Sequence, residues 1–278
     1  MNATDVVTPM VARAPIGVFD SGVGGLSVLR HIRAHLPHEH LVYFSDAQYA
    51  PYGQRPAAEI EARALAIGAY LQQRGAKAIV VACNTATAVA IAALRNAWPS
   101  LVLIGVEPGL KPAAAASINK IVGVLATSVT LASERFAQLR EQVTADSNTT
   151  FVLQACPGLV EQIEAGALDA DATVHLLRTY VISLLVQGAD TLVLGCTHYP
   201  FVLPQIQAIV AAHAACPIQI IDTGAAVARR LTHRLAACDG LSDAREGVME
   251  GVTSGNEQAL QQAMANLLHA QVRVTQVA

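Results

Sequence analysis

The sequence is poor in charged and aromatic residues, which make up 14% and 4% of its 278 positions. It has no run of lysine and arginine and a net charge of -3, whereas a nucleic-acid groove needs a clustered basic face. No apolar run is long enough to span a membrane, and residues 1–14 lack the apolar core of a signal peptide. We therefore expect a cytoplasmic protein without a nucleic-acid or membrane partner, and we interpret 1–14 as a disordered lead.

Cysteine and lysine are also scarce. The five cysteines are too few and odd in number for a disulfide scaffold, and no Cys-x-x-Cys pair or zinc-type Cys/His cluster is present. A pyridoxal cofactor would be bound through a lysine, but Lys77, Lys111 and Lys120 stand in no cofactor-like context. We therefore predict free thiols, no metal and no cofactor.

Hydrophobic residues are abundant, at 53%, and they gather in short runs that alternate with helical patterns at 26–36, 59–74, 172–187 and 225–237. Apolar runs without polar alternation, each followed by a helix, are typical of parallel sheets covered on both faces. The pattern predicts an α/β fold with mostly parallel sheets flanked by helices. The expected strands are 16–19, 41–44, 78–81, 101–106, 121–125, 151–153, 192–194 and 218–221.

The chain also repeats itself. Segments 74–85 and 187–198 align so that Cys83 corresponds to Cys196, and matches in the same order predict a duplicated α/β unit. Ligands of open parallel sheets bind at the carboxyl ends of strands, and both cysteines lie just past such ends. We therefore expect them to face each other across a cleft between two similar halves. Two further pairs of segments match in this order: 16–22 with 122–128, and 106–109 with 221–224.

Two facing thiols suit proton transfer at a weakly acidic α-carbon. One cysteine, as thiolate, would remove a proton from one face, while the other, as thiol, would deliver a proton to the opposite face. A free thiol has a pKa near ~8.5, so the thiolate needs hydrogen-bond donors or a helix N-terminus nearby. Each cysteine is predicted to open a helix. A lone buried cysteine is more often structural, but here polar neighbours repeat with the thiol.

Two further residues have both a functional and a structural interpretation. Asp20 begins the turn Asp20-Ser-Gly-Val-Gly-Gly, which lacks the Gly-Lys-Ser/Thr of a phosphate-binding loop. Its carboxylate could bind an ammonium group or orient a base, or it could cap the following helix. His198 lies two residues after Cys196 and could act as an acid or donor to the thiolate, or it could be an ordinary histidine.

Four motifs together resemble bacterial glutamate racemase: Asp20-Ser-Gly-Val-Gly-Gly, Pro51-Tyr-Gly, Ala82-Cys-Asn-Thr-Ala and Gly195-Cys-Thr-His-Tyr-Pro. The resemblance runs from Pro15 to at least Arg230. It implies cofactor-independent interconversion of L- and D-glutamate, which supplies D-glutamate for peptidoglycan, and it implies a homodimer. It also implies two pseudo-symmetric domains, 15–109 plus 224–278 and 110–223, with the active site in the cleft between them.

The resemblance further implies roles for single residues. Cys83 and Cys196 match the acid/base thiols, with Asp20 assisting the first and His198 the second. By the same analogy Cys83 deprotonates D-glutamate and Cys196 deprotonates L-glutamate. The positions that match substrate-binding residues of the family are Asp20, Ser21, Tyr52, Gly53, Asn84, Thr85, Thr197 and His198, and Asp46 and Glu164 match secondary acidic positions. The sequence repeat adds Thr127, which it pairs with Ser21, as a contact for a substrate carboxylate. We interpret the other cysteines, Cys156, Cys216 and Cys238, as structural.

One departure from the family keeps other substrates open. The stretch before Pro51-Tyr-Gly lacks an arginine that many relatives carry, and no arginine is placed to clamp a side-chain carboxylate. An aspartate racemase, or a relative acting on a hydantoin or a malonate-like acid, is the first alternative. A non-enzymatic module that binds an amino acid is the second, although no feature of the sequence favours it.

Overall fold

A computed structural model describes residues 12–277 of the chain. The predicted disorder of residues 1–11 lies outside the described residues. Residues 12–14 contact the rest of the protein, because Ala12 O accepts a hydrogen bond from Lys77 Nζ and Arg13 pairs with Asp243 at 3.0 Å. No helix in the described part of the chain is long and apolar enough to cross a membrane.

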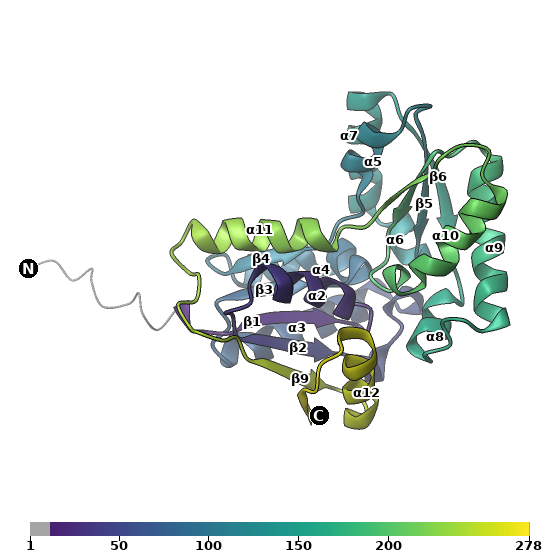
Figure 1. Cartoon of the computed structure of the whole chain (residues 1–278). Coiled ribbons are helices and arrows are strands. Elements are labelled where there is room, and N and C mark those ends of the chain that lie inside the picture. The colour runs from purple at the N-terminus through teal and green to yellow at the C-terminus, as the bar shows by residue number, and fades with distance from the viewer. Residues whose placement is uncertain (1–11, 278) are drawn as a thin grey trace, which may run out of the picture.

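Two parallel sheets form two lobes that lie side by side (Figure 1). The first lobe is built on a six-stranded sheet in the order β10-β9-β2-β1-β3-β4, and the second on a four-stranded sheet in the order β6-β5-β7-β8. The predicted parallel α/β fold is therefore confirmed. The strands are β1 Ile16–Asp20, β2 Leu41–Ser45, β3 Ala78–Val81, β4 Val102–Gly105, β5 Ile121–Ala126, β6 Thr150–Ala155, β7 Thr191–Leu194, β8 Gln219–Ile221, β9 Met249–Thr253 and β10 Arg273–Gln276.

The two sheets share one topology. The order β2-β1-β3-β4 of the first lobe is repeated as β6-β5-β7-β8 in the second. The pairing register repeats as well, since Ile16 pairs with Ala78 and Val122 pairs with Thr191, the positions that are equivalent in the sequence repeat. The repeat predicted from sequence is therefore present in the fold.

Helices cover both faces of each sheet, which explains why the strands are apolar on both sides. The predicted boundaries between 109 and 110 and between 223 and 224 fall in the two connections that link the sheets. In the first lobe α2 (Leu26–His35), α11 (Gly224–Ala236) and α12 (Glu257–Leu268) cover one face, and α3 (Ala57–Gln73) and α4 (Asn84–Ala97) the other. In the second lobe α8 (Leu159–Glu164), α9 (Asp171–Val186) and α10 (Leu203–His213) cover one face, and α5 (Leu110–Ala116) and α7 (Glu134–Ser147) the other.

The short segments near the lobe boundary complete the fold. Helix α6 (Ser128–Ala132) of the second lobe packs against the 3₁₀ turn η2 (Tyr52–Gln54) of the first. The turns η1 (Ala47–Tyr49) and η3 (Tyr199–Val202) lie in the loops after β2 and β7. These loops follow the carboxyl ends of their strands, so they line the boundary between the lobes.

Candidate active site

The two thiols occupy equivalent strand ends but differ in the element that comes next in the chain. Cys83 comes after β3 and caps α4, so that its Sγ accepts the N–H of Ala86 at 3.5 Å. Cys196 comes after β7, but η3 intervenes and α10 begins only at Leu203. The prediction that each cysteine opens a helix is therefore wrong for Cys196. Pro200 explains the difference, because it corresponds in the repeat to Thr87, whose N–H donates to Cys83 O at 2.9 Å, and proline has no N–H to donate to Cys196 O.

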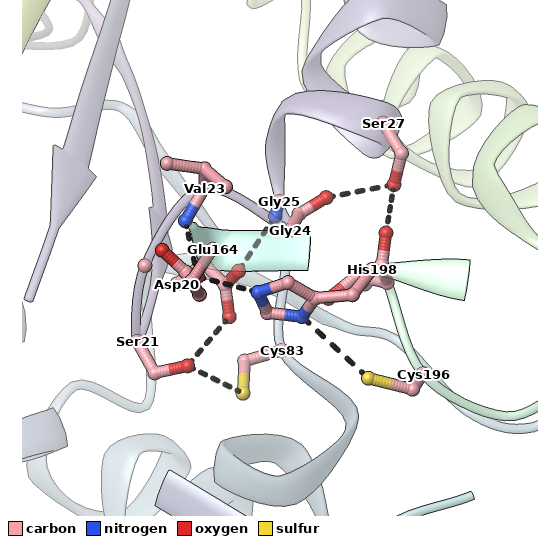
Figure 2. Close-up of polar contacts among 12 residues, drawn as sticks. Asp20, Ser21, Val23, Gly24, Gly25, Ser27, Cys83, Glu164, Cys196 and His198 are labelled. Carbon is pink, nitrogen blue, oxygen red and sulfur yellow. Dashed lines mark hydrogen bonds and ion pairs between the residues drawn. The ribbon is translucent and has the colours of Figure 1, made fainter. Parts of the chain in front are cut away.

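In the first lobe, Cys83 lies beside a buried carboxylate. Asp20 ends β1, has no exposed surface, and accepts the N–H of Gly25 through Oδ2 at 2.6 Å. Ser21 Oγ donates to Asp20 Oδ1 at 3.4 Å and lies 4.0 Å from Cys83 Sγ (Figure 2). The bond from Gly25 to Oδ2 is of the kind expected if Asp20 caps the following helix. The other oxygen, Oδ1, lies on the side of Ser21 and Cys83. Asp20 thus combines a local structural contact with a position next to Cys83.

In the second lobe, Cys196 lies beside an imidazole. His198 Nδ1 is 3.6 Å from Cys196 Sγ, and its Nε2 is 2.5 Å from Glu164 Oε1 (Figure 2). His198 is 2% exposed, so this ring is held by its two partners rather than by solvent. The carboxylate orients the imidazole, and the imidazole in turn can donate to the sulfur.

The two lobes meet at the glycine-rich turn after β1. The N–H of Val23 donates to Glu164 Oε1 at 2.8 Å, which ties the carboxylate of the second lobe to the backbone of the first. A Cβ at Gly22 would overlap the Glu164 carboxylate, and a Cβ at Gly24 would overlap Nδ1 of His198. The glycines are therefore required by the close approach of His198 and Glu164, a reason that the sequence did not reveal.

The electrostatics of the two sides differ. Burial, and then the negative charge of Asp20, raise the pKa of the Cys83 thiol well above its usual range. Burial alone would lower the pKa of His198, but its hydrogen bonds to Cys196 and Glu164 outweigh burial and raise that pKa well above 6.5. Burial opposes the ionisation of Glu164, yet the bond to His198 lowers its pKa. The arrangement therefore favours a protonated Cys83 and an imidazolium beside Cys196.

The sequence repeat explains this asymmetry. In the alignment Asp20 corresponds to Ala126, and His198 corresponds to Thr85. The Cys83 side therefore has a carboxylate without an imidazole, whereas the Cys196 side has an imidazole without that carboxylate. The two thiols are equivalent in position and different in their acid/base partners.

Hydroxyl and amide groups line the boundary next to the thiols. Thr85 Oγ1 lies 3.0 Å from Thr127 Oγ1 across the lobe boundary, and Thr130, which the sequence did not single out, joins both hydroxyls. Asn84 Nδ2 is buried and has no hydrogen-bond partner among the described residues. These groups offer donors for a carboxylate, and Gly53 packs against the Thr127 side chain.

The carboxylate of Asp46 contacts Tyr52 and Arg63 rather than either thiol. Asp46 is fully buried, and its carboxylate accepts the Tyr52 hydroxyl at 2.6 Å and the Arg63 guanidinium at 2.8 Å. The Tyr52 hydroxyl is thus engaged, so a ligand contact from this residue would come from its backbone. Arg63, missed in the sequence, also stacks on Tyr49 with 4.0 Å between guanidinium carbon and ring centroid.

The remaining cysteines do not form one class. Cys156 is buried, as a structural cysteine should be, and burial raises its pKa to about 12. Cys216 and Cys238 are exposed, so the structural interpretation is wrong for them. Cys216 follows α10 and Cys238 follows α11, so both lie in connections that are open to solvent.

Residues of both lobes line a small, partly open cavity next to Thr127. It measures about 60 Å³ and is lined by Pro51, Gly53 and Gln54 from the first lobe and by Thr127, Cys156 and Val160, among others, from the second. Gln54 Nε2 donates to Glu161 Oε1 across its rim. Within residues 12–277, no group of three or more His, Cys, Asp and Glu side chains is arranged to hold a metal ion.

Comparisons with known proteins agree on one family. Residues 16–231 match the Asp/Glu/hydantoin racemase family. The glutamate racemase of Ectopseudomonas mendocina is 49% identical over 263 residues, which are 95% of this chain and 98% of that protein. The glutamate racemase of Methylococcus capsulatus is 56% identical over 227 residues, or 82% of this chain and 81% of that protein.

Solved structures give the same result. A glutamate racemase from Bacillus anthracis matches with a TM-score of 0.87 at 30% identity and covers 96% of this chain and 98% of that one. The Escherichia coli glutamate racemase, solved with L-glutamate and the activator UDP-MurNAc-Ala, matches with a TM-score of 0.79 at 31% identity, covering 94% and 97% of the two chains.

Proposed function

Since this chain belongs to the Asp/Glu/hydantoin racemase family and is an isomerase of the glutamate racemase type, we propose that it interconverts L- and D-glutamate through two cysteine bases, Cys83 and Cys196. The observation that carries this proposal is the pair of thiols at equivalent strand ends of two repeated lobes, each with its own acid/base partner. The choice of glutamate as the substrate is supported by two related structures, which were solved with L-glutamate (Escherichia coli) and with D-glutamate (Francisella tularensis).

In the proposed reaction, the substrate α-carbon lies between the two sulfur atoms. The Cys196 thiolate takes the α-proton of L-glutamate, and the electron pair of the broken C–H bond moves into the α-carboxylate. The Cys83 thiol then protonates the carbon on the opposite face, and its own bonding pair stays on sulfur as a thiolate. Both transfers use side chains of the chain, so the reaction requires neither a metal nor an organic cofactor.

The neighbours of the thiols account for the proton balance. An imidazolium at His198 stabilises an adjacent thiolate, and Glu164 holds the ring in place. Cys83 begins as a thiol, and Asp20 can take its proton when the reaction runs from D-glutamate. The free donor of Asn84, with Thr85, Thr127 and the backbone near Tyr52 and Gly53, would bind the substrate carboxylates, while Ser21, Asp20 and Thr197 complete the proposed binding site.

The proposal also includes a cellular role. The enzyme would act in the cytoplasm and supply D-glutamate for peptidoglycan, and it would be a homodimer. Membership of the family supports this location, role and oligomeric state, whereas the geometry around Cys83 and Cys196 supports the reaction.

Conversion of single enantiomers tests the reaction and its substrate. Purified protein is given L-glutamate, D-glutamate, L-aspartate or D-aspartate without any cofactor, and the optical signal is followed by circular dichroism. We expect both glutamate enantiomers to reach a racemic mixture with equal kcat/KM, because the equilibrium constant between enantiomers is one. Faster racemisation of aspartate than of glutamate would contradict the proposed substrate.

A further inference from the structure

One buried hydroxyl joins helix α2 of the first lobe to the loop after β7 in the second. Ser27 is the second residue of α2, is 2% exposed, and has its Oγ 2.7 Å from the carbonyl oxygen of Thr197 (Figure 2). Thr197 separates Cys196 from His198 in the chain. The hydroxyl of Ser27 therefore contacts the backbone between the second thiol and its imidazole partner.

The same hydroxyl has a second acceptor within its own lobe. Ser27 Oγ also lies 2.8 Å from the carbonyl oxygen of Gly24, three residues earlier. A serine hydroxyl carries a single proton, so it donates to one carbonyl at a time. Both carbonyls lie within hydrogen-bond distance, so the proton can be directed to Thr197 or to Gly24. The bond to Thr197 is the one that joins the two lobes.

The sequence repeat provides an internal comparison. Ser133 corresponds to Ser27 in the alignment of 16–22 with 122–128, continued without a gap. Its Oγ makes the same local bond, to the carbonyl oxygen of Thr130 at 2.8 Å, and it caps α7. No bond from Ser133 to the other lobe occurs within the described residues. The contact from Ser27 to the opposite lobe is thus an addition to a local arrangement that both serines share.

The surroundings make this contact a determinant of His198 geometry. The turn just before α2 lies against the imidazole, because a Cβ at Gly24 would overlap Nδ1 of His198. The ring is fixed at its far side by Glu164, which is itself held by the N–H of Val23. On the backbone side, the bond to Ser27 holds the peptide that carries the ring.

We propose that Ser27 is a positioning residue for the second base: its hydroxyl anchors the Thr197 carbonyl and so sets His198 against Cys196. The proposal rests on the proposed function, because it gives Ser27 a part in preparing a catalytic thiol. Ser27 does not touch the substrate. Its effect should therefore be confined to the Cys196 side of the site.

A matched pair of substitutions isolates the hydroxyl. Ser27→Thr keeps the hydroxyl, whereas Ser27→Val introduces a side chain of nearly the same shape as threonine but without a hydroxyl. The readout is a short pulse of iodoacetamide followed by mass spectrometry of the peptides that contain Cys83 and Cys196. Both thiols face the same boundary, so a general loosening changes both alkylation rates, whereas loss of the imidazole partner changes their ratio.

We expect Ser27→Val to lower the ratio of Cys196 to Cys83 alkylation about tenfold, as one lost hydrogen bond can, and Ser27→Thr to keep the wild-type ratio. The kcat/KM for glutamate should fall with the ratio in Ser27→Val and recover in Ser27→Thr. Ser133→Ala, which removes the corresponding local bond and a helix cap, should leave the ratio unchanged.

Equal ratios in folded Ser27→Val and Ser27→Thr would overturn the proposal. If Ser27→Val does not fold, Ser27→Ala is compared with Ser133→Ala, and equal ratios in that pair would overturn it too. The alkylation ratio needs no substrate. A wild-type protein that does not racemise glutamate would thus refute the proposed function, while the ratio would still test the role of Ser27.

Discussion

At the scale of single residues, the Glu164–His198 pair makes the site dependent on pH. The pKa of His198 is raised above its ordinary 6.5, so its contribution to stability is complete below that pH and is lost as pH rises through the raised value. The pKa of Glu164 is lowered below its ordinary 4.5, so its contribution is complete above that pH and is lost as pH falls. The contribution of the pair is therefore largest between pH 4.5 and 6.5.

Glu164→Gln should reveal this dependence. We expect the variant to lower the free energy of unfolding by roughly 2 kcal/mol within that window, the order of a charge-assisted hydrogen bond, and by less at alkaline pH. Urea unfolding of both proteins at pH 5.5 and at pH 9.5 measures the difference. A loss that is the same at both pH values would contradict the ion pair.

Gly24→Ala tests the close approach of the lobes. The added Cβ would overlap the His198 ring, while the backbone of Gly24 does not have the positive φ that would make alanine strained. We expect kcat/KM for glutamate to fall about 100-fold, since small misplacements of catalytic groups have effects of that size. Far-ultraviolet circular dichroism serves as the control for folding, and full activity of a folded variant would show that the ring does not depend on this glycine.

At the scale of secondary-structure elements, a buried ion pair joins the residue before β3 to the loop before β2, at the amino ends of the strands and opposite the site. Lys77 Nζ lies 2.6 Å from Glu39 Oε2, and the two side chains are 1% and 2% exposed. Glu39 Oε1 also accepts the N–H of Ser242 at 2.9 Å, which ties the segment between α11 and β9 to this end of the sheet. Removing one member would leave a buried charge without its partner.

Lys77→Met should therefore lower the free energy of unfolding by about 3–5 kcal/mol without changing kcat. The double variant Lys77→Met/Glu39→Gln removes both charges and keeps an acceptor for Ser242, so it should regain most of the loss. Denaturant unfolding of the two variants measures this, and a double variant no more stable than Lys77→Met would contradict the explanation.

The elements that the sequence predicted are those whose patterns are local. Eight strands were expected because they are short apolar runs without polar alternation, and the structure has a strand at each. Strands β9 and β10 were missed, because Met249–Thr253 contains glutamate and glycine and Arg273–Gln276 is mostly polar at a sheet edge. Strand β9 pairs with β2 and β10 pairs with β9, so their places depend on a contact between segments about 200 residues apart in the chain.

The same limit applies to the site. The sequence motifs identified Cys83, Cys196, Asp20 and His198, because each residue lies at the end of a strand or just after it. Contacts across the lobe boundary had no local signal: the bond of Val23 to Glu164 joins residues 141 positions apart, and that of Ser27 to Thr197 joins residues 170 apart. Such contacts require the fold.

At the scale of the whole molecule, duplication of one α/β unit explains why two thiols meet in one site. Matching sheet orders place Cys83 and Cys196 at corresponding strand ends, and the substitutions of Ala126 for Asp20 and Thr85 for His198 between the copies make the two ends chemically different. The lobes are linked twice along the chain and by hydrogen bonds near the site.

The central claim is that both thiols transfer protons. Wild type, Cys83→Ala and Cys196→Ala are each incubated with L-glutamate and with D-glutamate in D₂O, and deuterium at the α-carbon is followed by NMR beside the optical signal. The account predicts that wild type forms the opposite enantiomer with deuterium at that carbon, and that each alanine variant forms no product of inverted configuration from either enantiomer. Full racemisation by either variant would contradict the two-thiol mechanism.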